Sequence, residues 1–173
     1  MQKTKNKVKQ HLIFVLLTLL LLLADQFTKH LAVIELRDKG RSIPLIEDVL
    51  SFTYLENRGA AFGLLQNARY FFIALTIAVM IGCGYYYIKK MNESFMKYPF
   101  ALLLLMAGAI GNLIDRIRFG YVVDFISLDI IHFPIFNVAD IFVTLAAAYF
   151  AYLVISEENA ASKKGRKEAQ HHE

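Results

Sequence analysis

Four long apolar stretches restrict what this chain can fold into. They cover residues 10–34, 70–88, 98–114 and 137–155. Because an α-helix rises about 1.5 Å per residue, the last stretch would span roughly 28 Å, close to the bilayer hydrocarbon thickness of about 30 Å. In addition, 57% of the residues are hydrophobic, against about 45–50% in soluble domains. The sequence therefore predicts an all-α polytopic membrane protein with four transmembrane helices.

The distribution of basic residues predicts how these helices are oriented. Lysines and arginines collect in the N-terminal tail, in the connection that carries Lys89, Lys90 and Lys97, and in the C-terminal tail. By the positive-inside rule these three regions face the cytoplasm, so both termini are cytoplasmic and the connections 35–69 and 115–136 lie outside. The net charge of +4 is thus a signal of topology, and we expect no nucleic-acid partner.

The connections and the tail complete the domain organisation. We expect one four-helix transmembrane domain over residues 1–156. A disordered cytoplasmic tail is expected over 157–173, because the residues there are polar and lack apolar periodicity. Residues 51–55 are aromatic and β-branched, and the Asn-Arg-Gly sequence that begins at Asn57 favours a turn. A small extracytoplasmic β-cradle is therefore expected within about residues 35–69.

The first apolar stretch has a second interpretation. Several lysines followed by the apolar run 12–23 also resemble a secretory signal peptide. However, the apolar pattern continues beyond Asp25 and Lys29, and residues 22–24 make a poor cleavage site. We therefore interpret this stretch as a retained transmembrane helix.

Polar side chains in or beside the apolar stretches indicate a functional site. With the predicted topology, the polar residues within the first, third and fourth apolar helices lie in the same leaflet of the membrane. An ionised carboxylate in a membrane is costly, and such residues usually serve a function. The sequence therefore predicts a polar pocket near the outer surface. The residues concerned are Asp25, Asn112, Asp115 and Asp140, with Asp124 and Asn137 beside them in sequence.

The third and fourth helices each present polar residues on one face. On the third helix, glycines and polar residues recur at helical spacing, and glycines let another backbone approach closely. On the fourth helix, Asn137 is a candidate N-cap, which places Asp140 in the first turn near the positive end of the helix dipole. The residues of the first face are Gly108, Gly111, Asn112 and Asp115.

Two of the aspartates suit acid–base chemistry. Asp124 lies in the apolar run 122–125, on a segment expected to be a loop or a re-entrant piece. Two carboxyl groups in a low dielectric do not both ionise easily, so one keeps a proton while the other acts as a base toward water. Such a pair hydrolyses amides, and we select Asp124 and Asp140 for it. For Asp115, a structural ion pair with the neighbouring Arg116 is the favoured interpretation.

Other chemistries fit the sequence less well. The histidines are scattered and no HExxH motif occurs, so we expect no metal and no cofactor. No serine has a recognisable companion base. A small transporter or proton channel is an alternative function. Proton relays, however, usually place ionisable groups at several depths of the membrane. A membrane scaffold held by Asp–Arg pairs is another, and it predicts that removing Asp124 or Asp140 unfolds the protein.

Five short motifs follow one another in the order and with the spacing of a known family. They are residues 25–29 (DQFTK), 57–62 (NRGAAF), 111–116 (GNLIDR), 122–125 (VVDF) and 136–140 (FNVAD). With these motifs and its four-helix layout, the chain resembles the lipoprotein signal peptidases, the type II signal peptidases of bacteria. The family commonly has paired glycines where this chain has Ala107 and Gly108, a difference that touches no catalytic group.

The resemblance implies an aspartyl endopeptidase of the bacterial cell membrane, with its active site near the outer leaflet. It would cleave the signal peptide of a prolipoprotein just before the diacylglyceryl-modified cysteine. Its partners would be prolipoprotein substrates and membrane lipid, and we expect a monomer. By motif, Asp124 and Asp140 are the catalytic residues. The resemblance assigns substrate binding to Asn57, Asn112, Arg116 and Asn137, the last of which also orients the catalytic pair, and structural support to Asp25 and Asp115.

Overall fold

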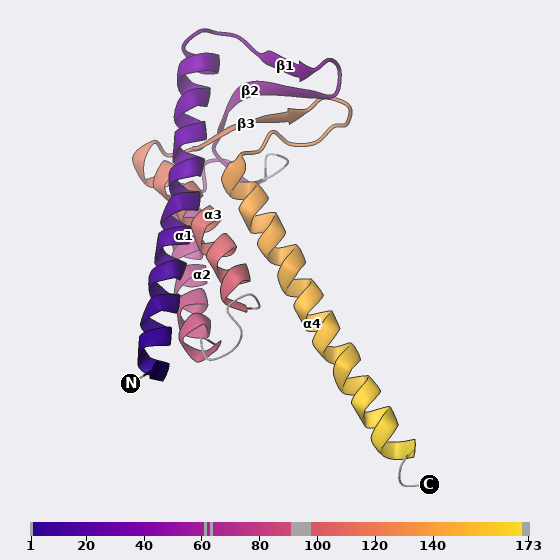
Figure 1. Cartoon of the computed structure of the whole chain (residues 1–173). Coiled ribbons are helices and arrows are strands. Elements are labelled where there is room, and N and C mark those ends of the chain that lie inside the picture. The colour runs from indigo at the N-terminus through magenta and orange to yellow at the C-terminus, as the bar shows by residue number, and fades with distance from the viewer. Residues whose placement is uncertain (1, 61, 63, 91–97, 171–173) are drawn as a thin grey trace.

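Three helices run side by side, and a fourth begins next to them beneath a small sheet and slants away toward the C-terminus (Figure 1). A computed structural model describes residues 2–60, 62, 64–90 and 98–170. Helix α1 begins, and helix α4 ends, at the end of the molecule away from the sheet (Figure 1). The elements are α1 (Gln2–Ala32), which continues as the π-helical turn η1 (Val33–Arg37), β1 (Ile43–Ile46), β2 (Leu50–Asn57), α2 (Arg69–Lys90), α3 (Tyr98–Arg118), β3 (Val122–Leu128) and α4 (Val138–Gln170).

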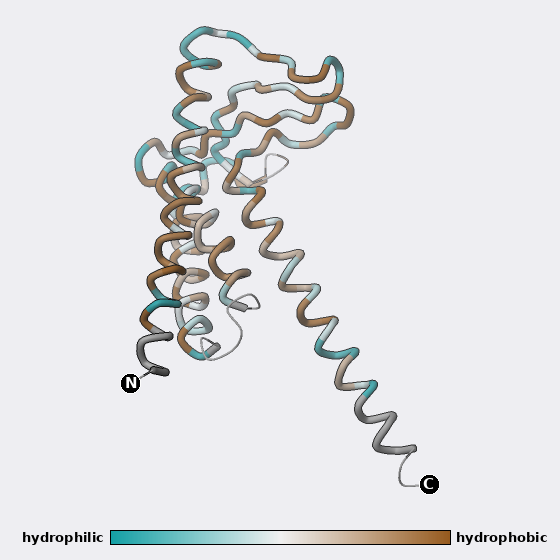
Figure 2. Tube along the Cα trace, in the orientation of Figure 1, coloured by the Kyte–Doolittle hydropathy of each residue, from teal (hydrophilic) through white to brown (hydrophobic). Residues whose placement is uncertain are grey.

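The four helices are long and apolar enough to cross a membrane, as the sequence predicted. The apolar segments are Val8–Arg37, Arg69–Lys89, Pro99–Arg118 and Val138–Lys163. Helix α3 is central, because it packs against each of the other three helices. In the most apolar part of α3, 50% of the residues are buried, compared with 11–17% in the corresponding parts of the other three helices. The apolar side chains that stay exposed on the helices are available to lipid, and Figure 2 marks the apolar residues along the trace in brown.

Two separate apolar cores hold the molecule together. One lies within the helical bundle, where side chains of all four helices meet. The other lies between the end of α1 and the sheet, so it fixes the sheet on top of the bundle. The buried members of the bundle core are Phe14, Cys83, Leu102, Leu103, Leu104 and Ala146, and those beneath the sheet are Ala32, Leu36, Val123 and Phe125.

The sheet confirms the small β-cradle predicted within residues 35–69, but it includes one strand from outside that range. It is antiparallel with the order β1-β2-β3, and its third strand comes from the connection between α3 and α4. The prediction of a loop or re-entrant piece around Asp124 was therefore wrong, since Asp124 lies in β3 opposite Leu55 of β2. The apolar, partly β-branched residues of β3 favour a strand, but its hydrogen-bonding partner is distant in sequence.

Two helix ends also differ from the predicted boundaries. Helix α3 continues beyond residue 114 to Arg118, so Asp115 and Arg116 are helical. Helix α4 continues to Gln170, whereas the sequence predicted a disordered tail from residue 157. The tail is rich in Glu, Ala and Lys, which have high helix propensity, so the helix extends past its apolar segment. Residues 171–173 lie outside the described part of the chain.

Close contact between α3 and α4 depends on Gly108. A Cβ atom built on Gly108 would collide with the backbone carbonyl oxygen of Ala139 and would lie 2.7 Å from Cγ2 of Val143. On the same face of α3, a Cβ atom on Gly111 would collide with the carboxyl group of Asp25. The glycine face predicted from the sequence is thus the surface on which α4 and Asp25 approach α3.

We predict that Gly108→Ala lowers the free energy of unfolding by about 1–3 kcal/mol, because the carbonyl of Ala139 can make room only by a backbone shift. Gly84→Ala in α2 is the matched control, since no atom of the described residues lies within 4 Å of a Cβ atom built there. This control should leave stability unchanged or raise it by up to about 1 kcal/mol. Thermal unfolding in detergent, followed by circular dichroism, measures both. Equal stability of the two variants would contradict the packing argument.

Candidate active site

The start of α4 is built around Asn137. Its Oδ1 accepts a hydrogen bond from the backbone N–H of Asp140 (3.0 Å), and Oδ2 of Asp140 accepts one from the backbone N–H of Asn137 (3.1 Å). This reciprocal pair is a capping box, which confirms Asn137 as the N-cap. It also holds Asp140 in the first helical turn, where the helix dipole favours a negative charge.

Asp124 is buried on β3 and held by two amides. Its side chain accepts hydrogen bonds from Nδ2 of Asn57 on β2 (2.8 Å) and from Nδ2 of Asn137 (2.6 Å). Burial, followed by the negative charge of Asp140, raises the pKa of Asp124 from its ordinary value of 3.8 to about 7, although both amides favour the ionised form. Asp124 therefore exchanges its proton close to neutral pH.

Asn112 connects the two aspartates through its amide. Its Nδ2 donates to Oδ1 of Asp140 (2.8 Å), and its Oδ1 accepts from Nδ2 of Asn137 (3.1 Å). In the part of the chain that the structure describes, no lysine or arginine nitrogen lies within 4.0 Å of Asp124 or Asp140. The pair is thus positioned by neutral amides and is not neutralised by a direct ion pair.

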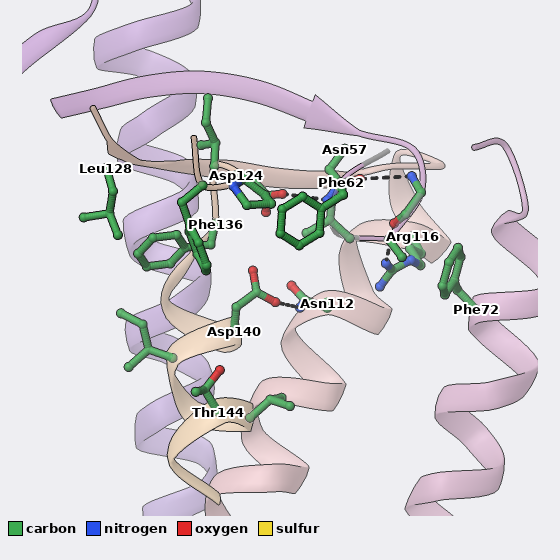
Figure 3. Close-up of a pocket in the computed structure, with 18 of the residues that line it drawn as sticks. Asn57, Phe62, Phe72, Asn112, Arg116, Asp124, Leu128, Phe136, Asp140 and Thr144 are labelled. Atoms are coloured by element: carbon green, nitrogen blue, oxygen red, sulfur yellow. Dashed lines mark hydrogen bonds between the residues drawn. The ribbon is translucent and has the colours of Figure 1, made fainter. Parts of the chain in front are cut away.

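A cavity of about 570 Å³ brings these residues together. Figure 3 shows the carboxyl groups of Asp124 and Asp140 directed toward the same space. Most of the remaining wall is apolar and aromatic, and it includes Phe62, Phe72 and Phe136. Of the residues predicted for catalysis or substrate binding, those that line the cavity are Asn57, Asn112, Arg116, Asp124 and Asp140.

Arg116 and Asn137 differ in how they relate to this cavity. Arg116 donates to the carbonyl oxygen of Gly59 (3.3 Å) and lies over the ring of Phe72 at 4.7 Å. Its guanidinium group has five N–H donors, so several are available to a ligand. Asn137 is fully buried and contacts both aspartates, which fits the orienting role better than direct substrate contact.

Lys29 is a site residue that was not predicted from the sequence. Its side chain is 4% exposed, and its Nζ lies 3.0 Å from both Asp25 and Asp115. It also donates to Oδ1 of Asn112 (2.9 Å), so all three ammonium protons have an acceptor. The available signal was a lysine four residues after an aspartate within an apolar helix, which is the spacing of a helical ion pair.

The two carboxylates bound to Lys29 hold the elements that carry the candidate pair. Asp25 accepts a hydrogen bond from the backbone N–H of Ala139 at the start of α4 (2.9 Å), and Asp115 accepts one from Val123 on β3 (3.1 Å). These contacts support a structural role for both residues. The predicted pairing of Asp115 with Arg116 was wrong, because Asp115 points to Lys29 on α1.

The chemistry available here is that of paired carboxyl groups. Among the described residues, no group of three or more His, Cys, Asp and Glu side chains is placed to hold a metal ion. Asp124 favours its protonated form below about pH 7, while Asp140 lies at the positive end of α4. A neutral acid and an ionised base on one cavity can activate water against an amide.

Comparison with known proteins identifies close similarities over most of the chain. The family model described as signal peptidase (SPase) II matches residues 17–156. A lipoprotein signal peptidase of Caldanaerobacter subterraneus subsp. tengcongensis is 52% identical over 132 residues, which cover 76% of this chain and 88% of that protein. One of Streptococcus thermophilus (strain CNRZ 1066) is 43% identical over 137 residues, covering 79% and 88%.

Solved structures agree with the sequence comparison. One bacterial membrane enzyme superimposes with a TM-score of 0.77 at 35% identity, over 84% of this chain and 89% of the other. A second superimposes with a TM-score of 0.72 at 36% identity, over 82% and 92%. The helices and the small sheet therefore belong to a fold already seen in membrane enzymes.

We predict that Lys29→Met lowers the free energy of unfolding by about 3–5 kcal/mol, because it leaves Asp25 and Asp115 as buried carboxylates without a cation. Lys29→Met combined with Asp115→Asn should recover part of this loss, since the cluster then has its original net charge. Thermal unfolding in detergent measures both variants.

Lys39→Met is the matched control for Lys29→Met. Lys39 makes the same type of ion pair with Glu35 (2.7 Å), but both side chains are exposed. This substitution should change stability by less than about 1 kcal/mol. If Lys29→Met were equally mild, the buried cluster would not be what holds these elements together.

Proposed function

The chain belongs to the signal peptidase II family, and from that premise we propose that Asp124 and Asp140 are the catalytic dyad of this bacterial membrane protease. As a member of that family, it removes signal peptides from prolipoproteins. We further propose that the cleaved bond lies immediately N-terminal to the lipidated cysteine. The observation that carries the dyad is the amide network, in which Asn112 and Asn137 hold both carboxyl groups on one cavity.

The different environments of the two aspartates suggest how they divide the work. Asp140, at the positive end of α4, is the ionised base that takes a proton from water. Asp124, whose pKa is raised to about 7, is the acid. The water oxygen attacks the scissile carbonyl carbon while Asp124 donates its proton to the carbonyl oxygen. When the carbon–nitrogen bond breaks, Asp140 gives the proton it received to the leaving amine, and one hydroxyl of the intermediate returns a proton to Asp124 as the carboxyl product forms.

The remaining polar residues fall into two groups in this proposal. Asn112 and Asn137 are positioning residues, since their amide groups are already bound to the dyad or to its supports. Asn57 lines the cavity but donates to Asp124, so it also orients the acid. Arg116 lines the cavity with spare donors, and it is the residue we assign to a substrate carbonyl.

The position of the cavity suits a substrate that stays in the membrane. It lies where the apolar helices meet the sheet, and its apolar wall reaches along α4 through Ile141, Val143 and Leu145. A lipidated peptide could thus keep its acyl chains in the bilayer while water reaches the dyad. We place this end of the molecule at the outer leaflet and both termini in the cytoplasm, according to the distribution of lysines and arginines. One chain supplies every residue of the site, so a monomer suffices.

We predict that Asp124→Asn and Asp140→Asn each reduce cleavage by about 10²-fold or more while the protein stays folded, because each removes one partner of the acid–base pair. The assay is cleavage of a diacylglyceryl-cysteine signal peptide by purified protein in detergent, with circular dichroism to follow folding. Asp129→Asn is the matched control, since Asp129 is exposed in the same connection as Asp124 and does not line the cavity.

Two outcomes would contradict this assignment. Loss of folding together with activity in both variants would make Asp124 and Asp140 structural residues. Absence of cleavage by a well-folded wild type, with the peptide lipidated and soluble, would instead favour a transport function for the carboxyl cluster.

We predict that kcat/KM falls as the pH rises through about 7, because Asp124 then loses the proton it donates. The free energy of unfolding should also fall as the pH rises. At pH values between the ordinary pKa of 3.8 and the raised value of about 7, the folded state holds this proton and the unfolded state does not. This contribution to stability is therefore lost as the pH rises through about 7. The melting temperature of Asp124→Asn relative to wild type should therefore increase with pH. A flat activity profile between about pH 5 and 9 would contradict the role of Asp124 as the acid.

A further inference from the structure

A second cavity lies between α1, η1, the end of α3 and the start of β3. Its volume is about 170 Å³, and none of its lining residues belongs to the active-site cavity. Its basic and carboxylate side chains are Lys29, His30, Arg37, Asp115 and Arg118. Lys29 and Asp115 have a structural role, and the proposed mechanism uses none of His30, Arg37 and Arg118.

Two basic side chains on this wall keep guanidinium donors for a ligand. Lys29 is not one of them, because it is already paired with Asp25 and Asp115 (both 3.0 Å). Arg37 pairs with Asp38 through Nε (2.9 Å) and also interacts with Tyr54, which leaves part of its five N–H donors. No carboxylate of the described chain lies within 4.0 Å of the Arg118 guanidinium. The cavity therefore offers an anion the guanidinium of Arg118, which has no carboxylate partner among the described residues, and the remaining donors of Arg37.

The guanidinium groups of Arg37 and Arg118 each lie over an aromatic ring, and these rings belong to one row. Arg118 lies over Phe119 at 4.9 Å, and Phe119 stacks on Tyr121 at 5.8 Å between ring centroids. The hydroxyl of Tyr121 lies 3.5 Å from that of Tyr54, whose ring is covered by Arg37 at 5.8 Å. Guanidinium groups that stack on rings are pre-organised, and their planar forks match the geometry of phosphate.

The cavity also lies at the depth where phospholipid headgroups are found. Arg37 and Arg118 are the last residues of the apolar segments Val8–Arg37 and Pro99–Arg118, so both mark the boundary between hydrocarbon and the polar layer. Just inside it, Leu31, Ile34 and Ile117 are exposed apolar side chains on which acyl chains can lie. Basic residues at helix ends often extend individually toward water, whereas these two line a single cavity.

From the two guanidinium groups on one cavity, the aromatic row and this depth, we propose that the second cavity binds the phosphate of an anionic phospholipid headgroup between Arg37 and Arg118. An anionic lipid is favoured over a zwitterionic one, because the choline ammonium of the latter would meet two cations. The bound lipid would occupy the surface between α1 and α3, next to the Lys29 cluster.

Native mass spectrometry of the purified full chain tests this proposal, with phosphatidylglycerol and phosphatidylcholine supplied in equal amounts. Wild type should retain phosphatidylglycerol in preference by about tenfold, since each interfacial cation strengthens attraction to an anionic lipid several-fold. Arg37→Gln combined with Arg118→Gln should abolish the preference, and Arg118→Gln alone should weaken it if the double variant fails to fold. Circular dichroism follows folding in each case.

Lys39→Gln combined with Arg41→Gln is the matched control. It removes the same charge from exposed residues that pair with Glu35 and do not line the cavity, so the preference should persist. Equal loss in both double variants, or no preference in wild type, would overturn the proposal. In a further arm, inorganic phosphate is added to the lipid-bound protein. Retention of the lipid supports the proposal, and release by phosphate at a concentration comparable to that of the lipid would assign the cavity to the free ion.

Discussion

The buried ammonium group of Lys29 is the interaction on which the rest of the site depends. It satisfies two carboxylates and one amide at once, and each of these partners continues to a different element. Asp25 binds the start of α4, Asp115 binds β3, and Asn112 binds Asp140. Desolvating so many charges is tolerable only if they are paired and hydrogen-bonded. The cluster therefore fixes the relative position of three helices and the sheet.

The placement of positive charge separates structure from chemistry. Asp25 and Asp115 share Lys29 and are stabilised in place, whereas Asp124 and Asp140 are held by the neutral amides of Asn57, Asn112 and Asn137. Because no cation among the described residues forms an ion pair with the second pair, burial raises the pKa of Asp124 to about 7. A carboxyl group that keeps its proton close to neutral pH is what the proposed acid–base hydrolysis needs.

Much of the fold and the candidate site could be predicted, because the relevant signals are local. Helix length and apolar content predicted the four spans, and the Asn137–Asp140 spacing predicted the cap of α4. Gly108 and Gly111 predicted a face of close approach. The strand around Asp124 was missed, since a short apolar run has no helical or alternating period to identify it, and its pairing with β2 is a long-range contact. Lys29 was missed because its partners on α3 are equally remote.

The sequence by itself determined that this chain crosses a membrane four times, that its polar exceptions share one level, and that it belongs with the signal peptidases. These properties depend on hydrophobicity, on helical periodicity and on short motifs, all of which are written in adjacent residues. Only the tertiary structure decided which carboxylates receive the buried cation and which are left to the amides. That decision depends on which side chains of α1, α3, β3 and α4 meet, because burial and charge act through space and not along the chain.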